Sequence, residues 1–171
     1  MEEKLSIKQV GLRYGIYLAI ISIIYSTLLQ ILGQGANKYL GYVSIIFLIV
    51  ALILAHNEFK KSNEYMSLGQ GFGISMIVIA LSTVISSIFT YLYIKLIDDS
   101  MLGIIRQQAE EQMLKRGMSD EQVDQAMNIS SKFMTAEAIL IMGILTGVFF
   151  GFIIGLIISA ITKKNPPEAV A

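Results

Sequence analysis

Four long apolar stretches, separated by polar segments, constrain this chain more than any other feature of its sequence. They cover residues 14–32, 40–55, 72–93 and 138–161. A helix rises 1.5 Å per residue, so about 20 apolar residues cross the roughly 30 Å of hydrocarbon in a bilayer. The first, third and fourth stretches are close to or beyond that length and contain no charge. The sequence therefore predicts an all-α integral membrane protein whose four spans form a helix bundle.

The second stretch is the shortest of the four, because residues 40–55 number only 16. A re-entrant segment is the alternative to a crossing. We expect a full crossing, since residues 45–54 are almost unbroken Ile, Leu, Val, Phe and Ala. The first stretch follows a charged N-terminal segment, as the apolar core of a signal peptide does. Its apolar part is longer than such a core and no small-x-small cleavage site follows, so we expect it to be retained.

The composition agrees with a membrane location and excludes several kinds of chemistry. Hydrophobic residues make up 54% of the 171 residues and charged residues only 15%, against about 25% in soluble domains. The 13 basic and 13 acidic residues cancel, which argues against a nucleic-acid partner because phosphate binding needs a basic face. There is no cysteine and only one histidine. We therefore expect no metal, no cofactor and no catalytic residue, with the lipid bilayer as the main partner.

The distribution of Lys and Arg predicts the orientation, because short cytoplasmic loops collect these residues. Seven of them fall on one side of the predicted spans: Lys4, Lys8, Arg13, Lys60, Lys61, Lys163 and Lys164. The other side holds Lys38 and a long segment, Lys95 to Glu137, with five basic and eight acidic residues. Tyrosines cluster near both proposed membrane boundaries, as they do in membrane proteins. Both termini are therefore expected in the cytoplasm.

Residues 98–137 form an insert between the third and fourth spans, and their pattern predicts an αα-hairpin outside the membrane. Gly117 separates two helix-forming arms, and Ser119 with Gln122 fits a capping box. The apolar stripes of the two arms are candidates for contact with each other and with a partner: Met101, Ile105 and Met113 on the first, Val123 and Met127 on the second. We expect the hairpin to stand upright, with helices lying flat on the headgroups as the alternative.

No Gly or Pro occurs between Ser119 and Ala138, so the second arm is expected to continue into the fourth span as one helix. Residues 162–171 are expected to form a short flexible tail. The whole chain, residues 1–171, is expected to be a single membrane domain.

The most specific motif is a line of small residues in the fourth span. It consists of Gly143, Gly147, Gly151, Gly155 and Ser159. Residues four apart share a helix face, so this line forms a groove of bare backbone that another helix can approach closely. We favour packing against another span of the same chain. A seam between copies in a homo-oligomer and a flexible gating helix are the alternatives.

Ionisable residues are absent from the four predicted spans, which argues against an ion-coupled pump. Small hydroxyl residues in the first and third spans fit helix packing better than a polar permeation path. The segment from His56 to Ser67 is expected to be a solvated loop at the headgroups. A general base or a metal ligand at His56 and Glu58 is the functional alternative, although no second His or Cys could complete a zinc site.

Two segments of the chain resemble a known family. They are FKKSNEYMSLGQGFG, from Phe59 to Gly73, and GMSDEQVDQAM, from Gly117 to Met127. They are similar to an uncharacterised family of four-span bacterial membrane proteins, known as a domain of unknown function. The resemblance covers nearly the whole chain and implies a bacterial inner membrane. It carries no activity or catalytic residue that could be transferred to this sequence.

Together these features predict a non-enzymatic membrane protein of structural or accessory type, whose outer hairpin contacts another membrane protein or a second copy of the chain. The alternative is a small transporter or channel component that works as an oligomer. A third class, a membrane enzyme acting on lipid, would depend on His56 and Glu58.

Overall fold

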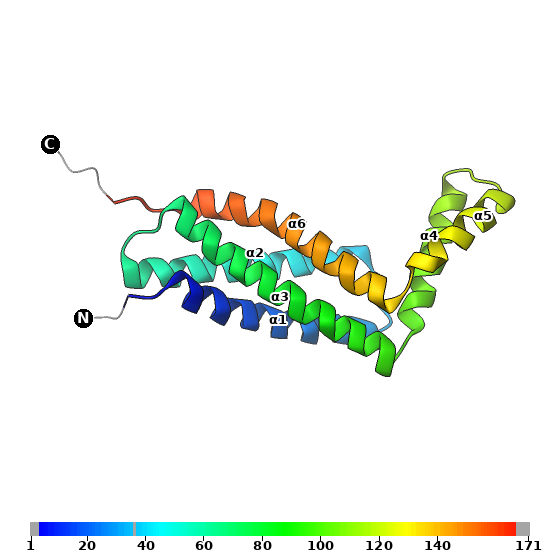
Figure 1. The fold of residues 1–171 in the computed structure, drawn as a ribbon, viewed down its shortest axis with the longest axis horizontal. Coiled ribbons are helices and arrows are strands. Elements are labelled where there is room, and N and C mark those ends of the chain that lie inside the picture. The colour runs from blue at the N-terminus through cyan, green and yellow to red at the C-terminus, as the bar shows by residue number, and fades with distance from the viewer. Residues whose placement is uncertain (1–3, 36, 167–171) are drawn as a thin grey trace.

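The computed structural model describes residues 4–35 and 37–166 of the chain and has an all-α architecture. Four long helices run side by side in a bundle, and two shorter helices form a hairpin at one end (Figure 1). The long helices are α1 (Ile7–Ile31), α2 (Lys38–Asn63), α3 (Leu68–Leu96) and α6 (Ala136–Thr162). The hairpin consists of α4 (Ser100–Lys115) and α5 (Asp120–Ser130), followed by the 3-10 turn η1 (Ser131–Phe133).

Each of the four long helices is long and apolar enough to cross a membrane, as predicted. The candidate span of α2 runs from Tyr39 to Asn63 and has 25 residues, so this helix is longer than its 16-residue apolar stretch. The prediction of a solvated loop from His56 onward is therefore wrong as far as Asn63. The helix continues because Leu52, Ala55 and Phe59, at helical spacing, are all buried and hold this turn against the bundle.

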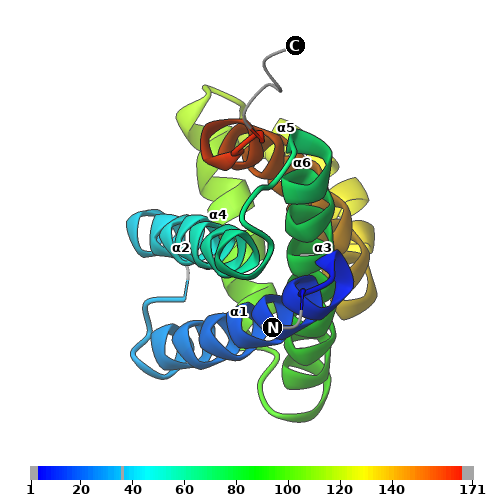
Figure 2. The same cartoon turned by 90° about the vertical axis from the view of Figure 1, so that its left-hand side faces the viewer.

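Helix α3 lies at the centre of the packing, with α1 and α6 as its two most extensive neighbours. An end-on view shows α1 and α6 on different sides of α3, with α2 alongside (Figure 2). The buried apolar core gathers toward the end that carries both termini and the α2–α3 turn. It contains Val10, Leu18, Leu52, Ala55, Phe59, Met66, Ile74, Val78, Ile79 and Ile158. We call this the basic end, after its seven Lys and Arg residues, and the opposite end the hairpin end.

Side-chain caps explain where several helices begin. Ser6 with Gln9 caps α1 and Ser67 with Gln70 caps α3, each in a reciprocal capping box. Ser119 and Gln122 form the predicted capping box of α5.

The prediction that the second arm of the hairpin continues into the fourth span is wrong. Helix α5 ends at Ser130 and η1 tightens the next turn. The backbone of Thr135 is extended, and its hydroxyl oxygen accepts a hydrogen bond from the backbone N–H of Ala138, so that α6 begins as a separate helix. Ser and Thr side chains compete for backbone hydrogen bonds in this way, so a helix can end without Gly or Pro.

The hairpin lies across the end of the bundle rather than standing upright along its axis (Figures 1 and 2). The reason is that α4 carries apolar residues toward the bundle as well as toward α5. Met101, Ile104 and Ile105 line a pocket together with residues of the α1–α2 connection.

The predicted flexible tail does not begin at residue 162. Thr162 is the last residue of α6, and Lys164 pairs with Met66 through two backbone hydrogen bonds of 2.9 Å. Residues 167–171 of this tail lie outside the described residues.

Candidate functional site

The basic end contains a buried polar network centred on His56, which sequence reasoning had placed in a solvated loop. The imidazole is fully buried. Its Nδ1 lies 2.7 Å from Thr162 Oγ1, and its Nε2 lies 2.9 Å from the Gly71 carbonyl oxygen and 3.1 Å from Ser75 Oγ. Ser75 in turn lies 3.2 Å from Ser159 Oγ. One side chain from α2 thereby joins α3 to α6.

The partners of His56 fix the direction of its hydrogen bonds. A carbonyl oxygen only accepts, so Nε2 must carry a proton and donate to Gly71. The Thr162 hydroxyl donates to the Ile158 carbonyl at 2.7 Å, and its single proton also lies within reach of Nδ1 of the neutral ring, which can only accept. Ser159 donates to the Gly155 carbonyl at 2.6 Å, which leaves its oxygen to accept from Ser75. Every polar atom of the network therefore lies within 3.2 Å of a hydrogen-bonding group.

Further hydrogen bonds tie the chain segments of the basic end together. Lys60 Nζ donates to the Thr162 carbonyl at 3.0 Å. Asn63 Nδ2 donates to the carbonyls of Leu5 and Phe59, both at 3.0 Å, which fixes the segment before α1 to the end of α2. With the Met66–Lys164 pairing, these contacts link the start of α1, the α2–α3 turn and the end of α6.

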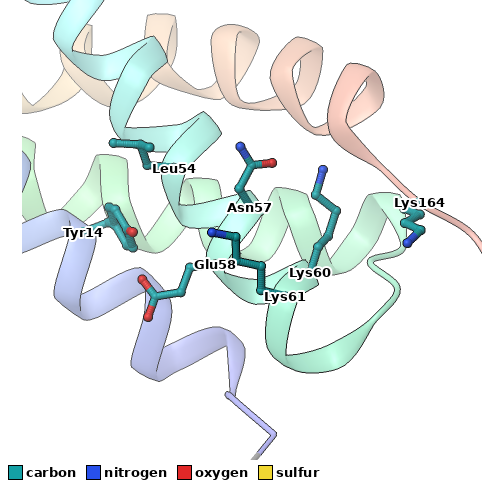
Figure 3. A pocket seen from close by; sticks show the side chains of 7 residues that line it. All are labelled: Tyr14, Leu54, Asn57, Glu58, Lys60, Lys61 and Lys164. Carbon is teal, nitrogen blue, oxygen red and sulfur yellow. The ribbon is translucent and has the colours of Figure 1, made fainter. Parts of the chain in front are cut away.

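A pocket of about 660 Å³ opens on the surface of the basic end. Its lining residues come from α1, from α2 and from the segment after α6: Tyr14, Leu54, Asn57, Glu58, Lys60, Lys61 and Lys164 (Figure 3). The lining therefore contains three lysines and one carboxylate, and Glu58 is already paired with Arg13. The ammonium of Lys164 lies 5.5 Å from the centre of the Tyr65 ring. We call this the basic pocket.

His56 and Glu58, the candidate general base or metal-ligand pair, point to different helices. His56 binds residues of α3 and α6, whereas Glu58 pairs with Arg13 of α1. Within residues 4–35 and 37–166, no group of three or more His, Cys, Asp or Glu side chains could hold a metal ion.

The glycine line of α6 faces α3, and each glycine is matched by one residue of that helix. Gly143, Gly147, Gly151 and Gly155 lie against Ser87, Thr83, Ile79 and Ser75 in turn. A Cβ added at Gly147 would lie 2.6 Å from Thr83 Cγ2, and one at Gly155 would lie 3.0 Å from Ser75 Cβ. A Cβ at Gly151 would overlap Ile79, while Gly143 meets only the Ser87 hydroxyl, at 3.0 Å. Ser159, the last residue of the line, belongs to the His56 network.

The opposite face of α3 receives a similar approach from α1. A Cβ at Gly11 would lie 2.7 Å from Ile77 Cβ, and one at Gly15 would lie 3.0 Å from Leu81 Cδ2. Both contacts leave too little room for a larger side chain without movement of a neighbour.

The stripe residues of the hairpin are distributed between its two arms and the bundle. Val123 is buried, whereas Met101, Ile105, Met113 and Met127 are half-buried. The large apolar side chains that the hairpin exposes most are others, Ile129 and Phe133, at 65% and 72% exposure. The most exposed apolar side chains of the hairpin therefore lie at and just after the end of its second arm, while Val123 is buried.

The hairpin end holds a second pocket, of about 430 Å³, between α4 and the ends of α1 and α2. Its polar lining residues include Tyr25, Ser26, Gln30, Asn37, Ser44, Thr90 and Asp98. Within the described part of the chain, the hydroxyls of Thr27 and Ser86 are buried with no hydrogen-bond partner. Asp98 accepts the backbone N–H and the hydroxyl of Ser100, both at 2.9 Å, and these bonds lower the pKa of its carboxyl.

A family of proteins of unknown function, DUF4199, matches residues 13–164, which is most of the chain. The chain belongs to the DUF4199 family. The match begins within α1, at Arg13, and ends at Lys164, so it includes most of α1, the other three long helices and the hairpin. Comparison with curated proteins and with solved structures found no match. The family resemblance expected from residues 59–73 and 117–127 is confirmed.

Sequence reasoning missed two features that the sequence does contain. The first is the spacing of Leu52, Ala55 and Phe59, which continues the second helix and carries His56 inside. The second is the line Ser75, Ile79, Thr83 and Ser87 on α3, which has the same four-residue step as the glycines of α6.

Proposed function

We propose that this protein is a non-enzymatic integral membrane protein that acts as an accessory module and binds a partner. The observation that carries the proposal is the saturated polar network of the basic end. His56 is the residue best suited to acid–base chemistry. Its two ring nitrogens lie within hydrogen-bond distance of the Thr162 hydroxyl and the Gly71 carbonyl. A catalytic base needs a free nitrogen within reach of a substrate, so these bonds favour a structural role.

Glycine-mediated helix packing belongs to the same proposal. In lipid, helices associate through close van der Waals contact and hydrogen bonds. The α3–α6 contact combines both, because Gly147 and Gly151 accept Thr83 and Ile79 while Ser75 reaches Ser159. A homo-oligomer would then need a different face, since α3 occupies the glycine line.

For the location we propose a bacterial inner membrane with both termini in the cytoplasm. The support is that all seven Lys and Arg residues outside the hairpin side gather at one end of the bundle. The hairpin would then lie on the periplasmic side.

The partner proposed is another membrane protein that binds the end of α5. Exposed apolar side chains outside the lipid-facing helices are typical of interaction sites. Ile129 and Phe133 are four residues apart, and Phe133 lies three residues before α6 begins. A partner there would sit close to the level at which α6 enters the bilayer.

Photo-cross-linking in native membranes tests this proposal. A cross-linking phenylalanine analogue at position 133 should give one discrete protein adduct, and the same analogue at the exposed Gln112 should not. Phe133→Ser should lose the partner in co-purification while keeping the melting temperature of the wild type. Adducts with lipid only, or equal adducts from both positions, would contradict a partner at this surface.

The alternative function, a small transporter or channel component acting as an oligomer, is favoured by one observation. The hairpin-end pocket has several polar side chains in its lining, and buried hydroxyls without partners in the described residues lie on α1 and α3, at Thr27 and Ser86. Four spans hardly enclose a solute path alone, so this function requires several copies. Chemical cross-linking in native membranes tests this function. A strictly monomeric protein would exclude a solute path formed by several copies.

A further inference from the structure

The basic pocket continues into an apolar groove, and the two have complementary chemistry. The groove lies between α1 and α2 and has a volume of about 310 Å³. Its lining is almost entirely apolar: Tyr14, Tyr17, Leu18, Ile20, Ile21, Phe47, Val50, Ala51 and Leu54. Tyr14 and Leu54 line the basic pocket as well, so the pocket and the groove share a wall.

The groove runs from the basic end toward the middle of the bundle. Leu54 and Phe47 are seven residues apart on α2, which corresponds to about 10 Å along the helix. The basic pocket lies at the end of this path, beyond Leu54, where α2 carries Lys60 and Lys61. A molecule that fills both must therefore be anionic at one end and apolar along the rest.

The lysines of the pocket are available to an anion. Lys61 makes no ion pair with any carboxylate in the described ranges, and it extends toward Tyr14 and Leu54 (Figure 3). Lys60 uses one of its three N–H groups on the Thr162 carbonyl. Glu58, the one carboxylate of the lining, is paired with Arg13.

We propose that the basic pocket and the α1–α2 groove together bind one anionic phospholipid. Its phosphate lies against Lys60, Lys61 and Lys164, and one acyl chain lies along Phe47, Val50 and Leu54. Basic pockets between membrane helices bind anionic headgroups in this manner. A free phosphate would fill the pocket alone, and a zwitterionic lipid would leave the excess positive charge of the lysines uncompensated.

Lipid binding to the purified full chain in a neutral detergent tests the proposal. Phosphatidylglycerol and phosphatidylcholine with identical acyl chains are added in turn, and bound lipid is counted by native mass spectrometry beside the melting temperature. We expect phosphatidylglycerol to bind more tightly and to raise the melting temperature more. Inorganic phosphate at the same concentration should do neither.

Two sets of variants separate the headgroup from the chain. Lys61→Gln and Lys164→Gln should each weaken phosphatidylglycerol binding about fivefold. Lys115→Gln and Lys132→Gln, on the hairpin, remove the same charge and should change nothing. Val50→Trp should fill the groove and weaken binding, whereas Ile46→Trp, exposed on α2 outside the groove, should not.

Three results would overturn the proposal. The first is equal binding of the two lipids by the wild-type chain. The second is a preference for phosphatidylglycerol that survives in the lysine variants or in Val50→Trp. The third is a rise in melting temperature with inorganic phosphate as large as that with the lipid, which would assign the pocket to a free anion.

Discussion

The two ends of the bundle differ in whether their buried polar side chains have hydrogen-bond partners. At the basic end, His56, Ser75 and Ser159 satisfy one another and the backbone around them. At the hairpin end, the buried hydroxyls of Thr27 and Ser86 have no partner within the described residues. A pocket of about 430 Å³ also opens at this end, whereas His56 is fully buried.

The contrast shows that polar residues in a membrane helix stabilise a bundle only where geometry pairs them. A buried polar group left unpaired costs about 1 to 3 kcal/mol, whereas a paired one contributes about 1 kcal/mol. The basic end therefore holds the better-paired polar contacts of the bundle. Matched substitutions at the two ends test this difference.

The largest difference is expected along the α3–α6 contact. Gly151→Leu should lower the free energy of unfolding by about 3 kcal/mol, because even a Cβ at this position overlaps Ile79. Gly143→Ala, nearer the hairpin end, should be nearly neutral, because the Ser87 hydroxyl can rotate away and alanine favours the helix by about 1 kcal/mol. Reversible unfolding in mixed micelles measures both.

Gly41→Ala is the control for helix propensity, since a Cβ at Gly41 of α2 meets nothing within 4 Å. It should raise stability slightly. A Gly151→Leu chain as stable as Gly143→Ala would show that the contact is not tight at the basic end.

The next effect concerns His56. His56→Ala should lower the free energy of unfolding by about 2 kcal/mol, because it leaves the Gly71 carbonyl and the Ser75 hydroxyl with fewer partners in a buried site. Tyr25→Phe is the counterpart at the hairpin end, where it removes the 2.8 Å bond from the tyrosine hydroxyl to the Leu40 carbonyl. Its cost should be about 1 kcal/mol. A smaller loss at His56 than at Tyr25 would reverse the comparison.

Serine substitutions at the two ends should change stability in opposite directions. Ser75→Ala removes a paired hydroxyl and should cost about 1 kcal/mol, whereas Ser86→Ala removes an unpaired one and should raise stability by up to about 1 kcal/mol. Melting temperatures measured side by side in one detergent suffice. A loss for Ser86→Ala would mean that its hydroxyl has a partner in solution.

The smallest effect is a pH dependence at the hairpin end. Hydrogen bonds from Ser100 hold the pKa of Asp98 below its ordinary value of 3.8. The charged carboxylate therefore stabilises the start of α4 above that pH, and the stabilisation is lost as the pH falls through the folded-state pKa. An NMR titration of the Asp98 carboxyl carbon should show the lowered pKa. Ser100→Ala should raise that pKa toward the ordinary value, and an unchanged titration would contradict the bond from the hydroxyl.

Much of the fold could be predicted from the sequence, because length and hydropathy decide the spans. The capping box at Ser119 and Gln122 likewise positioned the second arm of the hairpin. The break between α5 and α6 could not be predicted from Gly and Pro, because neither residue occurs there. It depends on the cap that Thr135 provides for α6. The orientation of the hairpin depends on tertiary contact with the bundle, which local patterns do not contain.

The candidate site was harder to predict than the fold. Polar residues from His56 onward are typical of a loop when taken one by one, and only the spacing of Leu52, Ala55 and Phe59 indicates a helix. The network that joins His56 to Ser75, Ser159 and Thr162 links three helices and depends on their packing. The basic pocket likewise combines residues more than 100 positions apart, such as Lys61 and Lys164.

We propose that the basic end and the hairpin end face opposite sides of a membrane. Cysteine labelling tests this topology directly. The chain contains no cysteine, so single cysteines at the exposed positions Asn57, Gln112 and Asn165 react without background. In intact cells, an impermeant maleimide should label Gln112→Cys alone. Asn57→Cys and Asn165→Cys should react only after the cells are opened. Labelling of Asn57→Cys in intact cells, or of all three variants alike, would contradict a bundle that crosses the membrane with its basic end inside.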